Sequence, residues 1–280
     1  MTTPPALLIA ANGTRDEAGA EAFRDFVREL GRRNPGLPVA GGCTEQSSPP
    51  LAEAVSELAE QGARHMTVVP LTLVTAGRAG GDIPAALARE QERHPGISYQ
   101  YGRPLGAHPK VLAMLERRLE DTLGEGARRP SDRAGTTVLL VGGGSTDPEA
   151  NAEVHRAARL FWEGRGFAGV ETAFVSLAAP DVPSGLDRCV RLGARRIVVL
   201  PYFLFTGVLP DRVRMQTEGW AAAHPEVDVI SADVIGATEE LVNLVMERYR
   251  EAVEESAEGD RRHGYAGGGD HQHGGHAHAH

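Results

Sequence analysis

Cysteine, excess positive charge and long apolar runs are all lacking in this chain of 280 residues. Its two cysteines, Cys43 and Cys189, form no CxxC pair, so neither a disulfide framework nor a thiolate zinc site is predicted. The net charge of −9 argues against a partner that is a nucleic acid. No stretch approaches the roughly 18 apolar residues of a membrane span, and the N-terminus lacks the pattern of a signal peptide. We therefore expect a globular, cytoplasmic protein that binds neither nucleic acid nor membrane.

What the chain does contain is an internal duplication. The segment LLIAANGTRD around Asn12 is repeated as LLVGGGSTDP around Gly143, and Pro49 is repeated as Pro180. The separation is constant, because 143 − 12 and 180 − 49 both give 131. A constant offset of this length is typical of duplicated domains and not of a short solenoid repeat. Two such domains that face each other would form a cleft, where small ligands usually bind.

Each half is expected to alternate strands with helices. The expected strands are 6–11, 39–43, 66–74 and 97–101, then 137–141, 170–175, 196–204 and 227–233. The expected helices are 16–32, 51–61, 82–93 and 109–123, then 151–163, 182–192, 211–223 and 239–255. Apolar strands that alternate with helices predict parallel sheets covered on both faces. The predicted fold class is thus α/β, with two similar domains, each a four-stranded parallel sheet flanked by helices, facing across a cleft.

Composition sets the expected domain bounds. The two domains are predicted at 5–123 and 137–256, joined by a polar, Gly- and Pro-containing linker at 124–136. From 257 to 280 the chain becomes rich in Gly and His and is expected to be disordered. A monomer with two pseudo-symmetric halves is the expected state.

Three stretches of the first half are predicted to lie where strands end. In an open α/β sheet, ligands bind beyond the carboxyl ends of the strands. After the first strand, the candidate residues are Asn12, Gly13, Thr14 and Arg15. Glu45 follows the second strand, and Gly77, Arg78 and Asp82 follow the third. The alternative is that these glycines only form turns. A phosphate loop at VGGGST is weakly supported, because both the GxGxxG spacing and a P-loop lysine are missing.

Six motifs of the chain resemble those of the sirohydrochlorin chelatases. They are LLIAANGTRD, AGRAGGDIPAAL, GRPLGAHP, LLVGGGSTDPEAN, VSLAAPDVPSGLDRC and LPYFLFTGVLPDR. This class II chelatase family inserts cobalt, nickel or ferrous iron into a tetrapyrrole without ATP, in the synthesis of sirohaem or cobalamin. The resemblance covers roughly residues 5 to 253. It implies a divalent metal and a tetrapyrrole as substrates, and no organic cofactor.

The family's two metal-binding histidines are replaced here. By the resemblance, Asn12 and Arg78 stand at those positions, whereas Glu45, Asp82 and the Gly-Thr-Arg run after Asn12 match the family. An amide is a poor metal ligand and no base, and a guanidinium repels a divalent ion. Arg78 is instead suited to pair with a carboxylate of the macrocycle. The resemblance thus assigns catalysis to Asn12, Arg78 and Glu45, with Glu45 as the remaining base and metal ligand.

Histidines gather at the C-terminal end of the chain. His271, His273, His276, His278 and His280 are spaced with Gly, Ala and Gln, and clustered imidazoles bind nickel, cobalt, zinc or copper. A cloning tag is the alternative origin. His108 precedes a helix and is expected to stabilise a turn. The function predicted from these features is metal insertion into a sirohydrochlorin-type tetrapyrrole, at either full or weakened activity. One alternative is a non-catalytic protein that binds tetrapyrrole or stores and delivers metal. The other is a nucleotide-binding domain.

Overall fold

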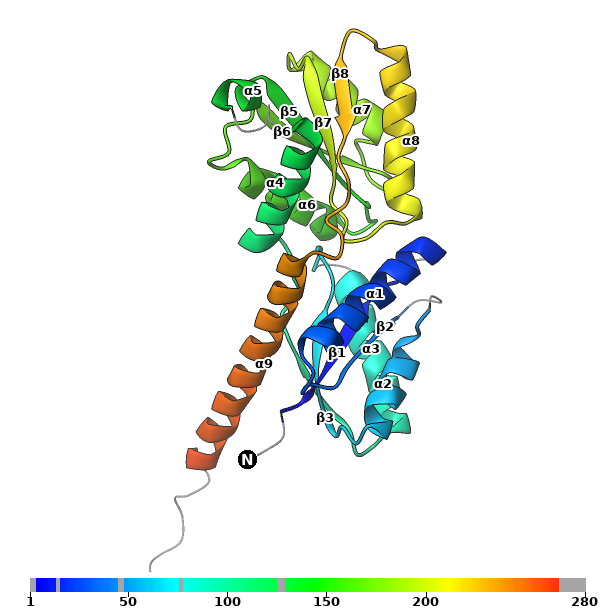
Figure 1. Ribbon diagram of the computed structural model, residues 1–280, viewed down its shortest axis with the longest axis vertical. Coiled ribbons are helices and arrows are strands. Elements are labelled where there is room, and N and C mark those ends of the chain that lie inside the picture. The colour runs from blue at the N-terminus through cyan, green and yellow to red at the C-terminus, as the bar shows by residue number, and fades with distance from the viewer. Residues whose placement is uncertain (1–3, 14–15, 45–47, 76–77, 125–128, 267–280) are drawn as a thin grey trace, which may run out of the picture.

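The computed structural model describes residues 4–13, 16–44, 48–75, 78–124 and 129–266, and the side chains of these except 78–82 and 259–266. The chain forms two separate four-stranded sheets (Figure 1). The first has the order β2-β1-β3-β4 and the second β6-β5-β7-β8, and every pair of neighbouring strands is parallel. The predicted α/β class and the equivalence of the two halves are therefore confirmed.

Strands and helices alternate along both halves. The strands are β1 (Ala6–Ala11), β2 (Val39–Cys43), β3 (His65–Pro70), β4 (Ser98–Tyr101), β5 (Thr136–Gly142), β6 (Gly169–Phe174), β7 (Arg196–Pro201) and β8 (Asp228–Ser231). The helices are α1 (Glu17–Arg33), α2 (Leu51–Glu60), α3 (Arg78–Arg93), α4 (Pro109–Leu123), α5 (Pro130–Ala134), α6 (Pro148–Trp162), α7 (Val182–Arg191), α8 (Val208–Ala223) and α9 (Glu239–Ala266). None of the helices in the described part of the chain is long and apolar enough to cross a lipid bilayer.

Several helices begin where a side chain satisfies the free backbone N–H groups of the first turn. The Asp16 carboxylate accepts a hydrogen bond from the Gly19 N–H at 2.9 Å, and Asp181 accepts one from Ser184 at 2.9 Å. His108 does the same for α4, since its Nδ1 accepts from the Lys110 N–H at 3.1 Å. The expected turn-stabilising role of His108 is thereby confirmed.

The buried strands are apolar on both faces because helices cover both. Along β1, Leu7 and Ile9 point to one face and Leu8 and Ala10 to the other, with the two-residue period of a strand, and each of these side chains is inaccessible to solvent. Helices α2 and α3 cover the Leu8 face. This arrangement reproduces the layers expected from the sequence.

The last helix of each half lies on the sheet of the other half (Figure 1). Helix α4, from the first repeat, packs against β7 and α6, whereas α9, from the second repeat, packs against β3, β4 and α1. The predicted domain bounds, 5–123 and 137–256, follow the duplicated sequence and do not include this exchange. Its consequence is an apolar core shared by the two halves, which joins one face of each sheet.

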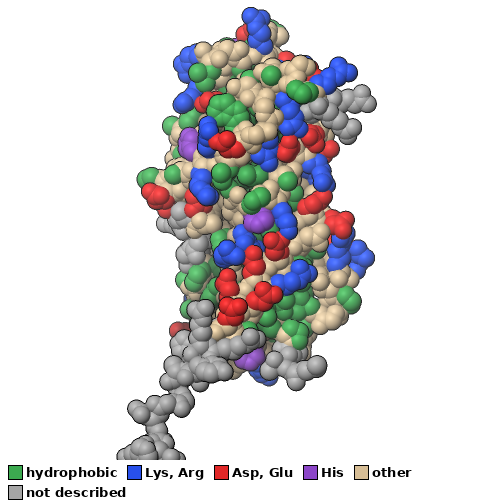
Figure 2. Space-filling model, turned by 90° about the vertical axis from the view of Figure 1, so that its left-hand side faces the viewer, with side chains coloured by type: hydrophobic (Ala, Val, Ile, Leu, Met, Phe, Trp, Pro, Cys, Tyr) green, Lys and Arg blue, Asp and Glu red, His purple; other side chains and the backbone are tan. Residues whose placement is uncertain are grey.

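Figure 2 shows a face of the molecule on which positively and negatively charged side chains are interspersed. Ion pairs join the two exchanged helices. Lys110 and Arg117 of α4 pair with Glu247 and Glu240 of α9. Arg118, also on α4, donates two hydrogen bonds to the Ile235 carbonyl, at 3.0 and 2.7 Å. The halves are thus connected by polar contacts as well as by the shared core.

Most element bounds lie within a few residues of the expected ones, and the larger differences have physical reasons. The strands expected at 66–74 and 196–204 end at Pro70 and Pro201. The apolar residues that follow them are buried between the halves, so their hydrophobicity reflects packing and not strand pairing. Residues 130–134 of the expected linker form α5, and β5 begins inside it at Thr136. Helix α9 continues to Ala266, ten residues beyond the predicted end of the domain, and residues 267–280 lie outside the described part.

Candidate functional site

The strand order of the first sheet brings the three predicted loops to one edge. Strand β1 lies between β2 and β3, with Ala11 opposite Cys43 and Ala10 opposite Pro70. The chain segments that follow these three parallel strands therefore start side by side at the carboxyl edge of the sheet. Asn12 begins the central one.

The described residues of this edge are partly buried. The Thr44 N–H donates to the Ala11 carbonyl at 3.0 Å, and Gly13 has a φ of +94°, in the left-handed region that favours glycine. Asn12 Oδ1 and Thr44 Oγ1 are shielded from solvent and accept or donate no hydrogen bond within the described ranges. Two polar side chains thus lie together at the end of β1 and β2.

Most of the other predicted site residues fall outside what the structure describes. Thr14, Arg15, Glu45 and Gly77 lie in the gaps at 14–15, 45–47 and 76–77. Arg78 is the first residue of α3 and Asp82 lies one turn further along, but their side chains are not described. The five tail histidines, His271, His273, His276, His278 and His280, are also outside. Across the described residues, no three His, Cys, Asp or Glu side chains gather to form a metal site.

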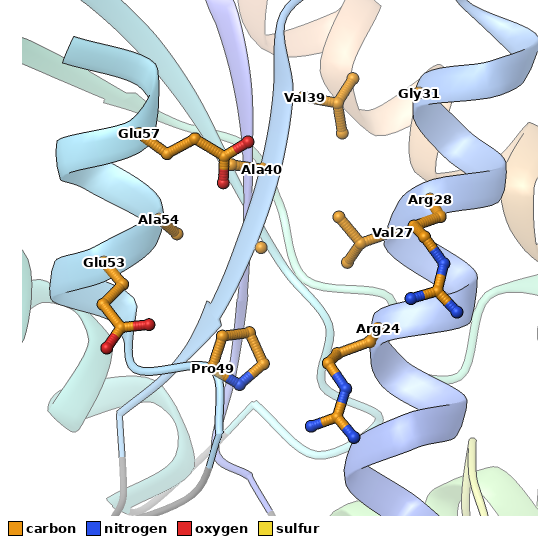
Figure 3. Close-up of a pocket in the computed structure, with 11 residues that line it drawn as sticks. Arg24, Val27, Arg28, Gly31, Val39, Ala40, Pro49, Glu53, Ala54 and Glu57 are labelled. Atoms are coloured by element: carbon orange, nitrogen blue, oxygen red, sulfur yellow. The ribbon is translucent and has the colours of Figure 1, made fainter. Parts of the chain in front are cut away.

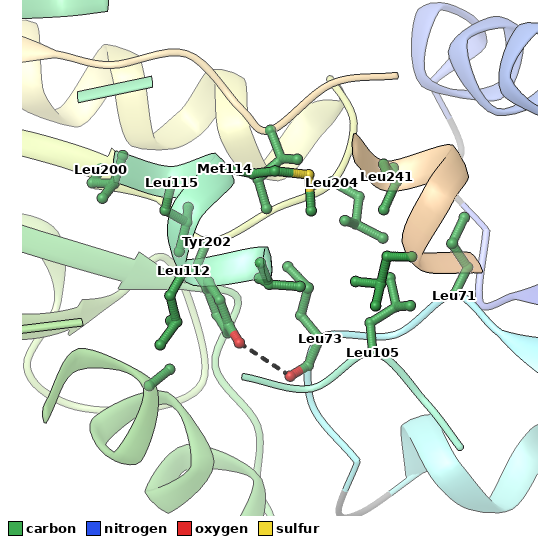
Figure 4. Close-up of a cluster of buried hydrophobic side chains, with 14 of the residues drawn as sticks. Leu71, Leu73, Leu105, Leu112, Met114, Leu115, Leu200, Tyr202, Leu204 and Leu241 are labelled. Atoms are coloured by element: carbon green, nitrogen blue, oxygen red, sulfur yellow. Dashed lines mark hydrogen bonds between the residues drawn. The ribbon is translucent and has the colours of Figure 1, made fainter. Parts of the chain in front are cut away.

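The segment that leads from β3 towards Arg78, residues 71–75, is bound by both halves. On the first half, the Leu71 N–H donates to the Ala10 carbonyl at 2.8 Å and the Gly106 N–H donates to the Thr72 carbonyl at 3.1 Å. On the second half, the Tyr202 hydroxyl donates to the Leu73 carbonyl at 3.3 Å (Figure 4). Burial raises the pKa of Tyr202, and the nearby Glu153 charge adds to the effect, so the phenol remains a donor.

Apolar side chains from both repeats surround this contact. Figure 4 shows Leu71, Leu73 and Leu105 of the first half beside Tyr202 and Leu204 of the second. All of these are buried within the shared core. The candidate site therefore begins directly at the junction between the halves.

Thr75, the last described residue before the gap, is bound by Glu153 of α6. Its backbone N–H donates to Glu153 Oε2 at 2.5 Å, and its hydroxyl donates to Oε1 of the same carboxylate. Hydrogen bonds to an ionised acceptor are about twice as strong as neutral ones. A side chain from the second repeat thus holds the end of a first-repeat loop.

The equivalent edge of the second sheet has a different chemistry. Gly143 and Ser176 occupy the positions of Asn12 and Glu45, and the Ser176 hydroxyl donates to the Gly143 carbonyl at 3.0 Å. A Cβ at Gly144 would lie 1.7 Å from the Ser176 carbonyl oxygen, so the two loops are in direct contact. These two positions of the second edge thus carry neither an imidazole nor a carboxylate.

A shallow groove of about 300 Å³ lies elsewhere, along the outer strand β2 (Figure 3). Arg24 and Arg28 project from α1 on one side of it, and Glu53 and Glu57 project from α2 on the other. Its floor is formed by β2 residues, including Ala40. The groove therefore follows the edge of the sheet and not the three loops predicted to bind the substrate.

Reasoning from the sequence placed Thr75 in the third loop but missed Tyr202 and Glu153. A signal for both existed, because the copies differ there: with the offset of 131, Glu153 corresponds to Ala22 and Tyr202 to Leu71. A position that is polar in one copy and apolar in the other indicates that the two copies differ in function there.

Comparison with known proteins identifies the family. The family model CbiX matches the chain twice, over residues 6–122 and 137–252. The sirohydrochlorin cobaltochelatase of Priestia megaterium is 32% identical over 249 residues, which are 89% of this chain and 80% of that protein. The sirohydrochlorin ferrochelatase of Bacillus subtilis is 29% identical over 252 residues, or 90% of this chain and 93% of that protein.

Solved structures agree over the whole fold. SirB from Bacillus subtilis with Fe3+ superposes with a TM-score of 0.74 at 27% identity, covering 91% of this chain and 97% of that one. The sirohydrochlorin chelatase SirB from Bacillus subtilis subspecies spizizenii in complex with cobalt gives a TM-score of 0.71 at 26% identity, covering 90% and 96%. The resemblance to sirohydrochlorin chelatases is thereby confirmed, and the chain belongs to the CbiX family.

Proposed function

We propose that this protein inserts a divalent metal, namely cobalt, ferrous iron or nickel, into a sirohydrochlorin-type tetrapyrrole. The observation that carries the proposal is the extent of the similarity: relatives named sirohydrochlorin cobaltochelatase and ferrochelatase match both repeats and nearly the full chain. Metal and macrocycle are both substrates of this reaction. The reaction then belongs to the synthesis of sirohaem or cobalamin.

The proposed site is the carboxyl edge of the first sheet. Metal insertion requires a base that removes protons from the pyrrole nitrogens and a ligand that holds the incoming ion. We assign both roles to Glu45, because a carboxylate binds divalent ions and accepts protons. The side chain of Asn12, at the end of the central strand, contacts the macrocycle in this assignment, as do Gly13, Thr14, Arg15, Gly77 and Asp82.

Arg78 receives a different task from the histidine that the family places there. A guanidinium is permanently charged and repels a metal ion, but it forms paired hydrogen bonds with carboxylates. The macrocycle carries several carboxylates on its rim. Arg78 is therefore assigned to substrate binding, which separates binding of the macrocycle from delivery of the metal.

The C-terminal histidines are proposed to bind metal independently of this edge. Neutral imidazoles are good ligands for nickel, cobalt and zinc, and five of them occur between His271 and His280. We expect the fold to be kept when residues 267–280 are removed.

One assay tests both proposals. The full chain and a chain that ends at Ala266 are incubated without oxygen with sirohydrochlorin and Co(II), Ni(II) or Fe(II), and absorbance follows the metallated product. We expect both chains to accelerate insertion of at least one metal over the uncatalysed rate, while the shorter chain binds fewer metal ions in calorimetry. Tetrapyrrole binding without acceleration by any metal would support the non-catalytic alternative, and equal metal stoichiometry would remove the tail's role.

A further inference from the structure

Glu153 belongs to the second repeat but binds the first. It lies on α6, and both of its carboxylate oxygens accept hydrogen bonds from Thr75, one from the backbone N–H and one from the hydroxyl. The two residues are 78 positions apart in the chain. Thr75 is the residue from which the chain continues to the start of α3 at Arg78.

The part of α6 that carries Glu153 is held in place by its neighbouring residues. Two residues earlier, Asn151 holds the loop that precedes α6: its Oδ1 accepts from the Ser145 N–H at 2.9 Å and its Nδ2 donates to the Ser145 carbonyl at 2.8 Å. One residue later, Val154 is buried in the shared core. Glu153 is thus presented by a helix that is anchored on both sides.

The other anchors of the 71–75 segment act further from Arg78. The bonds of Leu71 and Thr72 attach it to the first half, and the bond from Tyr202 attaches Leu73 to the second. Within the described ranges, the Thr75 N–H and hydroxyl both donate to Glu153. At its last described residue, this segment is therefore held by a carboxylate of the second half.

We propose that Glu153 is a positioning residue for this reaction: by binding Thr75 from the opposite half, it holds the end of the 71–75 segment at the carboxyl edge of the first sheet, where the macrocycle is proposed to bind. This inference rests on the proposed function. It also makes the second repeat, whose own strand ends carry no ligand-like residues at the equivalent positions, a working part of the site. A displacement of about 1 Å in such a group is enough to cost one or two orders of magnitude in a reaction.

The variants that test this role are Glu153→Gln, Thr75→Val and both together. Glu149→Gln is the matched control, because it makes the same change in charge on the same helix at an exposed position. We expect Glu153→Gln to raise the KM for the tetrapyrrole about tenfold and leave the KM for Co(II) unchanged, since a charge-assisted pair becomes a neutral one. A role in stability alone would reduce the active fraction, and with it the apparent kcat, but leave both KM values in place.

Two further readouts do not depend on turnover. Tetrapyrrole affinity, measured by fluorescence quenching, is expected to fall with Glu153→Gln and not with Glu149→Gln, and hydrogen exchange of the Thr75 amide is expected to accelerate. The double variant should be no weaker than the weaker single one, because both changes break the same contact. If the wild-type protein binds tetrapyrrole but inserts no metal, the proposed function fails while the affinity still tests Glu153. Unchanged affinity and exchange in Glu153→Gln, or an equal loss in the control, would overturn the inference.

Discussion

At the scale of single residues, the informative positions are those at which the two repeats differ. Asn12 corresponds to Gly143 and Glu45 to Ser176, which restricts the proposed metal chemistry to the first sheet. The sequence predicted these positions because ends of parallel strands are recognisable as apolar runs followed by Gly-rich loops. It could not predict the contact between Glu153 and Thr75, because pairing of two distant polar residues leaves no local pattern.

The first prediction concerns the two substituted ligand positions. Asn12→His combined with Arg78→His is expected to raise the rate of metal insertion about tenfold or more, because two imidazoles hold an ion that one cannot and the repulsive charge is removed. Each single change is expected to do less. Rates are measured with Co(II) and sirohydrochlorin at fixed pH.

The same double variant is expected to bind the macrocycle more weakly, because the carboxylate pairing of Arg78 is lost. Equal turnover in the wild-type protein and the double variant would show that these two positions do not form the metal site of this chain.

At the scale of helices and strands, the exchange of α4 and α9 is the feature that the sequence did not reveal. The apolar stripe of α4 indicated that it is buried, but periodicity does not say against which sheet. The structure places Glu116 of α4 against Arg133 of α5 at 2.7 Å and against Arg165 of the second half at 2.8 Å. These ion pairs attach α4 to α5 and to the second half.

Glu116→Gln is expected to destabilise the protein by about 1–3 kcal/mol at pH 7, because Arg133 and Arg165 each lose an ion pair with a largely buried carboxylate, while Arg133 keeps its pair with Glu120. Burial raises the pKa of Glu116, but hydrogen bonds from Arg133 and Arg165 outweigh this, and the pKa is lowered overall. The stabilisation is therefore present above the ordinary pKa of a glutamate and is lost as the pH falls through the lowered value.

Urea unfolding between pH 3 and pH 7 measures this difference. The gap in free energy of unfolding between wild type and Glu116→Gln should close towards acid pH. Asp121→Asn is the control, because Asp121 forms an exposed pair with Arg118 at 3.3 Å and its loss is expected to cost well under about 1 kcal/mol. A gap of constant size across this pH range would show that the ionised carboxylate is not the stabilising group.

At the scale of the whole molecule, the two repeats form a single folding unit. A shared apolar core joins one face of each sheet, with α4 and α9 each covering part of the sheet of the other half. Each repeat taken alone would expose to water the part of its sheet that the helix of the other half covers. The duplicated sequence correctly predicts that the two halves share one fold. It does not predict that each half depends on the other for its packing.

The protein is therefore expected to unfold in one cooperative transition. Both tryptophans, Trp162 and Trp220, lie in the second half, so their fluorescence reports on that half, whereas far-ultraviolet circular dichroism reports on both. The two signals should give the same urea midpoint. Separate midpoints would show that the halves fold independently in spite of the exchanged helices.

The central claim is that metal insertion takes place at the carboxyl edge of the first sheet, with Glu45 as base and ligand. The most direct measurement is Co(II) insertion into sirohydrochlorin by Glu45→Gln, compared with Ser176→Ala at the equivalent position of the second repeat. We predict that Glu45→Gln lowers kcat about a hundredfold, the scale of a lost general base, and that Ser176→Ala retains turnover close to that of the wild type. Turnover by Glu45→Gln equal to that of the wild type, or an equal loss in both variants, would contradict the account.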